Sequence, residues 1–147
     1  IYNGYQALVM LFYRTNKTMQ ESSVINYLYG GVHRSQAYFK YKAYYNNYLL
    51  NVAGRTAWVK VDGALLIGDI EVTEIKDVPH LLGKLKLLAF WLGCTKIVFP
   101  VCTGTNWDMV LKQQVQAQKG IYVGYLDLQS GLPLDNFKYV FADSDTF

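Results

Sequence analysis

The spacing of apolar residues changes along the chain, and the change predicts where helices give way to strands. Between Tyr48 and Thr73 apolar residues tend to recur at every second position, which is typical of strands. Breaks at residues 53–55 and at Asp62-Gly63 divide this stretch into expected strands at 48–52, 56–61 and 65–73. Because Asp-Gly favours the positive φ of tight hairpin turns, we expect an antiparallel three-strand meander.

A helical spacing follows the meander. From His80 to Leu92 the leucines recur at i, i+3 and i+4 positions, with Lys84 and Lys86 off that stripe, so we expect an amphipathic helix packed on the sheet. Lys96 to Val101 indicates a buried strand, and residues 106–118 indicate a helix with Asn106 as its N-cap. Two further strands are expected at 120–128 and 137–142.

The N-terminal third is predicted to hold one strand and two helices. The continuous apolar run from Ala7 to Tyr13 fits a central strand that is buried on both faces. Thr18 and Glu21 have the spacing of a capping box, which predicts a helix to about Tyr29, ended by Gly30-Gly31. A second helix is expected from Ser35 to about Tyr45.

Composition supports one globular domain over residues 1–147. The chain is 52% hydrophobic and 17% charged, with a net charge of +3, which permits an anionic ligand but falls short of a nucleic-acid footprint. No apolar run reaches the roughly 18 residues that span a bilayer, so we expect no membrane partner and a cytoplasmic location. Cys94 and Cys102 have no metal-ligand spacing, and we interpret them as free thiols, with no metal site.

The order of elements from Leu65 to Tyr125 is strand, helix, strand, helix, strand. Such a βαβ unit places a crevice at the carboxyl end of its first strand, facing the N-terminus of a helix. This edge of the sheet is where we first expect a ligand.

The order of elements over nearly the whole chain resembles the GNAT superfamily of acyl-CoA N-acyltransferases. Val98-Phe-Pro-Val101, followed by Asn106, a helix and Gly120-Ile-Tyr122, is similar to that family's strand, Asn-led helix and Gly-Phe strand. Residues 62–68 are similar to its common hairpin. The resemblance implies an α/β (α+β) fold with a mixed central sheet of about seven strands and helices on both faces.

The resemblance also implies acetyl-CoA as cofactor, bound where the Leu65 and Lys96 strands splay apart. Its pyrophosphate would lie on backbone N–H groups of the loop that opens the following helix. On this chain the binding positions would be Val78, His80, Leu81, Leu82, Gly83, Lys84 and, on the later helix, Asn106. The loop has a single glycine and the acidic Asp77, where the family motif has small residues.

Acetylation of an amine needs a base for the ammonium proton and an acid for the leaving thiolate. The resemblance gives the base role to Glu71 or Glu74, and Tyr122 is a candidate acid. Asp69 is expected either to face water or to take part in the acceptor pocket, which would receive a small-molecule or peptide amine.

Two main hypotheses for function follow. The first is a divergent N-acyltransferase that moves an acetyl group from acetyl-CoA to an amine. The alternative is a catalytically inactive module of the same fold, acting as a structural or protein-interaction part of a larger assembly such as a phage or virion particle.

The segment 33–48 mixes aromatic and cationic residues, which suits either a protein partner or RNA. Because Tyr38, Tyr41, Tyr45 and Tyr48 follow a helical spacing, we favour packing or a protein-binding face over nucleic acid.

Overall fold

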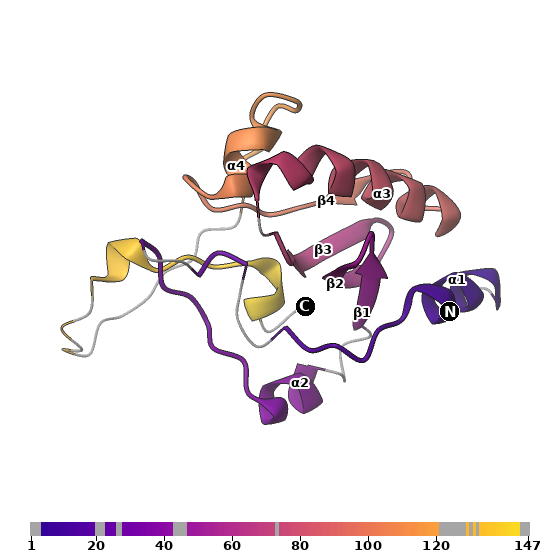
Figure 1. Cartoon of the computed structure of the whole chain (residues 1–147), viewed down its shortest axis with the longest axis horizontal. Helices are drawn as coiled ribbons and strands as arrows, with labels where there is room; N and C mark the ends of the chain where they lie inside the picture. Colours follow the sequence, from indigo (N-terminus) through magenta and orange to yellow (C-terminus); the bar gives the residue numbers. More distant parts are fainter. Residues whose placement is uncertain are drawn as a thin grey trace.

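A four-stranded mixed sheet forms the centre of the molecule (Figure 1). The computed structural model describes residues 4–19, 23–25, 28–42, 47–72, 74–120, 129, 131 and 133–144. The strands lie in the order β1 (Asn47–Val52), β2 (Arg55–Val61), β3 (Leu65–Ile70) and β4 (Ile97–Val98). The first two pairings are antiparallel and the third is parallel, which confirms the meander and the strand–helix–strand unit. The expectation of about seven strands is wrong for the described residues, which form four.

Tight turns set the register of the meander. Ala53 and Gly54 join β1 to β2 with φ values of 53° and 80°, and the N–H of Gly54 donates to Asn51 Oδ1 at 2.8 Å. Positive φ at both positions matches the right-handed twist of the two strands. Gly63, with φ 62°, turns β2 into β3, as its place after Asp62 predicted.

One face of the sheet is covered by α3 (Val78–Trp91), which confirms the predicted amphipathic helix. Its buried side chains include Leu81, Leu85 and Leu88, which pack in one apolar cluster with residues of all three meander strands. The helix α4 (Asn106–Leu111) lies beside α3, and its Trp107 joins the same cluster (Figure 1).

The opposite face is covered mainly by irregular segments. Trp58 of β2 packs there with Met19, Val24, Val140 and Ala142. The short helix α2 (Gln36–Lys42) adds Tyr38 and Phe39, and the ring of Phe39 stacks on Trp58 with centroids 5.0 Å apart. Two 3-10 turns, η3 (Leu134–Asn136) and η4 (Phe141–Asp143), belong to the C-terminal segment on this side.

The predicted strand at 7–13 is wrong, because Gly4–Tyr13 forms the helix α1. Its Val9, Met10 and Tyr13 contact the apolar cluster under α3, and Gln6 Nε2 donates to the carbonyl of Leu92 at 2.7 Å. After the helix, Arg14 bridges to Leu50 and Thr15 donates to Leu49, so the chain covers the outer edge of β1.

Other predicted elements are shorter than expected or absent from the described residues. No helix follows Thr18 in the described part of 18–29, because Met19 and Val24 enter the apolar cluster around Trp58 instead. The helix predicted at 106–118 ends at Leu111, and the strand predicted at 96–101 pairs only at Ile97–Val98.

Residues 137–142 form one bridge from Phe137 to Gly30 and the turn η4, so the strand predicted there is wrong. Most of the strand predicted at 120–128 lies outside the described residues.

Candidate functional site

The expected pyrophosphate loop is the first part of α3, and its residues point in different directions. Val78 and Leu81 are fully buried in the apolar cluster, and Leu82 is half-buried. His80, Gly83 and Lys84 are exposed. Of the positions assigned to acetyl-CoA by resemblance, only His80, Gly83 and Lys84 share an exposed side of α3, while Val78 and Leu81 lie in the core.

The N-terminal end of α3 also has few free donors for an anion. The 3-10 turn η2 (Ile75–Asp77) runs directly into α3, so the N–H groups of Asp77 and Val78 donate to Glu74 and Ile75. Pro79 has no N–H. The carboxylate of Asp77 lies at this end and pairs with Arg55 Nη2 at 3.0 Å. A phosphate placed here would meet a carboxylate, which offsets the favourable helix dipole.

The candidate acid–base residues have structural partners. Glu71 continues the β2–β3 pairing, since its N–H donates to Thr56 O at 3.0 Å and its Oε2 accepts from Thr56 N at 2.8 Å. Glu74 is exposed and pairs with Lys76 at 2.6 Å. Tyr122 lies outside the described residues. The catalytic roles of Glu71, Glu74 and Tyr122 therefore stay predictions, and the described contacts do not bring these residues together in one site.

Asn106 is not the N-cap of α4, so that interpretation is wrong by one residue. Thr105 is the cap, and its Oγ1 accepts from the N–H of Asp108 at 3.3 Å. Asp108 in turn accepts from Gly104 N at 2.8 Å and from Lys112 Nζ at 2.6 Å. Burial alone would raise the pKa of Asp108, but the hydrogen bond from Lys112, the Gly104 N–H and the Lys112 charge together lower it.

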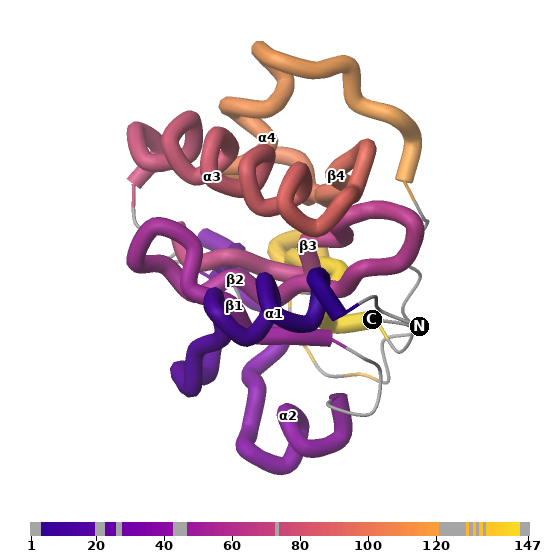
Figure 2. Tube along the Cα trace, turned by 90° about the vertical axis from the view of Figure 1, so that its right-hand side faces the viewer, coloured from indigo at the N-terminus to yellow at the C-terminus, as the bar shows by residue number. Residues whose placement is uncertain are grey.

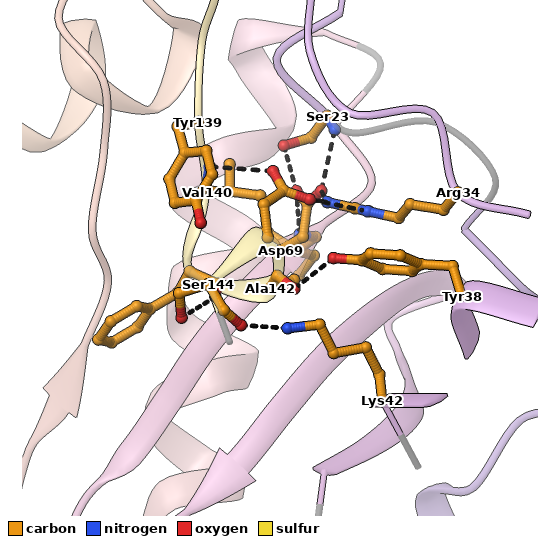
Figure 3. Close-up of polar contacts among 12 residues, drawn as sticks. Ser23, Arg34, Tyr38, Lys42, Asp69, Tyr139, Val140, Ala142 and Ser144 are labelled. Atoms are coloured by element: carbon orange, nitrogen blue, oxygen red, sulfur yellow. Dashed lines mark hydrogen bonds and ion pairs between the residues drawn. The ribbon is translucent and has the colours of Figure 1, made fainter. Parts of the chain in front are cut away.

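A buried charge cluster, which the sequence did not predict, occupies the other face of the sheet (Figure 3). Arg34 Nη2 lies 2.8 Å from Asp69 Oδ2 and 3.0 Å from Asp143 Oδ1, and all three side chains are fully buried. Asp69 also accepts from the N–H and the hydroxyl of Ser23 and from the N–H of Ile70. The expectation that Asp69 faces water is therefore wrong.

A bulge in β3 places Asp69 on this face. Trp58 pairs with Asp69 and Val59 pairs with Ile67, so Gly68 has no partner in β2. One extra residue in a strand reverses the side of the sheet that the following side chains occupy. Asp69 consequently shares the face of Trp58, while Ile70 returns to the apolar cluster under α3.

Burial governs the electrostatics of this cluster. It raises the pKa of Asp143, with a smaller contribution from the Asp69 charge, and this outweighs the opposing effects of Arg34 and the Val140 N–H. Burial alone would lower the pKa of Arg34, but the two carboxylates keep it above its ordinary value. Arg34 Nη1 is buried and has no hydrogen-bond partner among the described residues, and the guanidinium lies 5.3 Å from the Trp58 ring centre.

The cluster fastens the C-terminal segment to the sheet. Tyr38 donates its hydroxyl to the carbonyl of Ala142 at 2.9 Å, and Lys42 donates to the carbonyl of Ser144 (Figure 3). The thiol of Cys102 donates to the carbonyl of Tyr139 at 2.9 Å. The carboxylates of Asp69 and Asp143, Arg34 Nη2, and the side-chain donors of Tyr38 and Lys42 all bond within the chain, so we assign the cluster a structural role.

A small hollow lies beside the cluster, past the end of β4. It is lined partly by Ser23, Cys102, Thr105 and Trp107, and its accessible volume of about 10 Å³ is at the lower limit for holding one water molecule. It has no room for the pantetheine arm of a coenzyme.

The described residues carry no other cofactor signature. No group of three or more His, Cys, Asp or Glu side chains among them is placed to hold a metal ion. Cys94 and Cys102 are both free, as predicted. No described helix has the length and apolar character needed to cross a membrane.

The tyrosine-rich segment 33–48 is used largely for packing where the structure describes it. Tyr38 is half-buried against Trp58, with ring centroids 6.2 Å apart, and Tyr48 packs on the apolar cluster under α3. Tyr41 is exposed, and Tyr45 lies outside the described residues. Because Arg34 and Lys42 are buried, these cations are not available to a nucleic-acid backbone.

Seven of the thirteen large apolar side chains that are exposed among the described residues belong to the helices α1 and α3. We call this the α1–α3 apolar surface; its members are Tyr5, Leu8, Leu11 and Phe12 of α1 and Leu87, Phe90 and Trp91 of α3, each 43% to 85% exposed. The start of α1 approaches the C-terminal end of α3, where Gln6 bonds to the carbonyl of Leu92, the residue after α3. In Figure 2 the rest of α1 lies below α3, at the level of the strands. The sequence signal for α1 is the absence of charge between Gly4 and Tyr13; the apolar run from Ala7 to Tyr13 within it predicts a buried strand instead.

Comparison of the chain with known proteins identifies no related protein. No protein-family model matches the chain, and neither a curated protein nor a solved structure shows significant similarity to it.

Proposed function

We propose that this domain is a non-catalytic protein-interaction module, the second of the two functions considered from the sequence. The observation that carries the proposal is the α1–α3 apolar surface, with Phe12 85% exposed and Phe90 73% exposed. Four of these exposed side chains lie on the uncharged helix α1, and exposed apolar patches are typical of sites of association. A supporting observation is that buried Val78 and Leu81, together with Asp77, occupy the positions where acetyl-CoA would need open backbone donors.

The N-acyltransferase remains the second candidate, and one observation favours it. The parallel strands β3 and β4 pair only at Leu65–Ile97 and Leu66–Val98 before the chain segments separate. A separating parallel pair is what the GNAT resemblance expects around acetyl-CoA. In that case a small-molecule or peptide amine would be the acceptor.

A thermal-shift titration with acetyl-CoA separates these two functions. A ligand that binds only the folded state raises Tm by mass action, by an amount set by its concentration relative to Kd. We expect no rise at millimolar acetyl-CoA for the interaction module. A rise that is reduced in a His80→Ala/Lys84→Ala double variant would instead support the acyltransferase and its predicted cofactor positions.

A second measurement tests the surface directly. Because Phe12 is exposed, we expect Phe12→Ser to change the free energy of unfolding by no more than about 0.5 kcal/mol. The same variant should bind less of a hydrophobic dye such as ANS at low protein concentration. A large loss of stability would mean that Phe12 serves the fold, and would contradict its role in association.

A further inference from the structure

The outer side of α3 carries apolar and cationic side chains in a fixed order around the helix. At roughly 100° per residue, Lys86 and Lys84 lie at the two edges of the exposed side, and Leu87, Phe90 and Trp91 lie between them. The rings of Phe90 and Trp91 contact each other, with centroids 5.7 Å apart. Because Leu87 lies one turn before both rings, the three apolar side chains are neighbours on one helix.

The charge on this side of α3 is positive. The helix has no acidic residue. Glu74 and Asp77, which precede it, are paired with Lys76 and Arg55. The two exposed lysines therefore give the outer side of α3 a charge that complements an anionic partner.

From this order we infer that the outer side of α3 binds an anionic lipid surface, with the helix lying in the plane of the membrane. Leu87, Phe90 and Trp91 enter the boundary between headgroups and acyl chains, and Lys84 and Lys86 reach the lipid phosphates. Aromatic and aliphatic side chains flanked by lysines are typical of surfaces that lie in a membrane interface. A helix in this position needs no membrane-spanning length, so the expectation drawn from the lack of a spanning segment does not oppose it.

The inference goes beyond the proposed function. Of the α1–α3 apolar surface, it gives the α3 part to lipid and leaves the exposed side of α1 to a protein partner. The difference in charge is the reason for this division. None of the ten residues of α1 is charged, so α1 has no group that recognises an anionic headgroup, whereas α3 has two lysines.

A nucleic acid is the other polyanion that lysines and aromatic rings can bind, and the geometry favours lipid. Bases stack on the open faces of aromatic rings. The rings of Phe90 and Trp91 meet edge to face, at an interplanar angle of 70°, so they do not form one flat stacking platform. Leu87 beside them offers no ring, whereas an acyl boundary accepts all three side chains.

Co-sedimentation of the full chain with lipid vesicles tests the inference. We expect binding to vesicles of phosphatidylcholine mixed with phosphatidylserine, weaker binding as salt is raised, and little binding to phosphatidylcholine alone. Phe90→Glu should lower the partition coefficient by about tenfold or more, because it replaces an apolar group at the acyl boundary with a charge. The double variant Lys84→Gln/Lys86→Gln should lower it by about tenfold as well, and it remains decisive if Phe90→Glu disturbs folding.

Matched controls change the same properties outside α3. Tyr41 is 48% exposed on α2, which covers the opposite face of the sheet, so Tyr41→Glu adds a charge there. Lys17→Gln/Lys40→Gln removes two exposed lysines elsewhere and gives the same net charge as the α3 double variant. Both controls should leave vesicle binding unchanged. Absence of binding to the anionic vesicles would overturn the inference, whether or not the chain binds a single-stranded oligonucleotide, and so would equal losses in the α3 variants and the controls.

Discussion

The two faces of the sheet are stabilised in different ways. The face under α3 is an apolar cluster built mainly from the stretch 47–111, in which strands and helix follow one another. On the opposite face, Trp58 is covered by Met19, Val24, residues 34–42 and the segment 137–144, which hold buried charges and side-chain hydrogen bonds to the backbone. The comparison shows two ways to cover a face of a sheet: an apolar cluster under a regular helix, and irregular segments held by buried ion pairs and hydrogen bonds.

The two faces of the sheet differ in how well they tolerate a substitution. An apolar cluster loses stability in proportion to the side chain that is removed. In a buried ion cluster, removal of one member leaves its partners charged and unpaired in a low-dielectric site. The face of Arg34 is therefore expected to be the more sensitive to a single substitution.

The largest effect is expected from Arg34→Met. It leaves the buried carboxylates of Asp69 and Asp143 without their cation, and we expect a loss of about 3 to 5 kcal/mol in the free energy of unfolding, measured with urea. Arg55→Met is the control, because the Arg55–Asp77 pair is partly exposed and should cost no more than about 1 kcal/mol. Equal losses in the two variants would contradict the difference between the faces.

On the α3 face, Leu85→Ala is expected to cost about 3 kcal/mol, because it leaves a cavity beneath the helix. Leu87→Ala, two residues along the same helix, removes a 43% exposed side chain and should change stability by about 0.5 kcal/mol or less. Chemical denaturation of both variants measures the contrast. A cost for Leu85→Ala above that of Arg34→Met would reverse the expected ranking of the two faces.

Tyr38→Phe tests the attachment of the C-terminal segment. It removes the hydrogen bond to the Ala142 carbonyl but keeps the ring against Trp58, so we expect a loss of about 1 kcal/mol. Hydrogen exchange of the segment 137–144 should become faster in the same variant. Tyr5→Phe, on the exposed side of α1, should change neither quantity.

The smallest effect is a difference in pH dependence. Because the folded-state pKa of Asp143 is raised, its contribution to stability is present below the ordinary carboxyl pKa of about 3.9 and is lost as pH rises through the raised pKa. The stability of the native chain relative to Asp143→Asn should therefore fall as pH rises through that range, as measured by urea unfolding at several pH values.

Asp108→Asn provides the comparison of opposite sign. The pKa of Asp108 is lowered, so its contribution is present above the ordinary pKa and is lost as pH falls through the depressed pKa. Identical pH profiles for the two variants would show that the buried cluster does not control the ionisation of Asp143.

The sequence predicted the α3 face well because its signals are local. Asp62-Gly63 marks a hairpin, and the leucines around Leu85 mark one side of a helix, whatever the rest of the chain does. The run from Ala7 to Tyr13 misled because a short continuous apolar segment fits a buried strand and a helix equally. What distinguishes them here are contacts with residues far along the chain, such as the hydrogen bond from Gln6 to the carbonyl of Leu92.

The sequence could not predict the buried charge cluster, for a different reason. Arg34 and Asp143 are 109 positions apart, and no spacing rule connects them. Asp69 follows strand alternation only until the bulge at Gly68, which reverses its side. The burial of two candidate acetyl-CoA positions could have been predicted. Val78 and Leu81 lie on the same side of the helix as the leucine stripe, which faces the core.

The distance between Arg34 and Asp143 also has a consequence in time. At a synthesis rate of about 5 to 20 residues per second, Asp143 follows Arg34 out of the ribosome by roughly 5 to 22 seconds. For the later part of that interval Asp69 is already present, because it follows Arg34 by only 35 positions, but Val140 and Ala142 are not yet there to cover Trp58. The nascent chain therefore exposes the face of the sheet that carries Trp58 until the C-terminal segment has been made. Chaperones that recognise this domain would act within that interval.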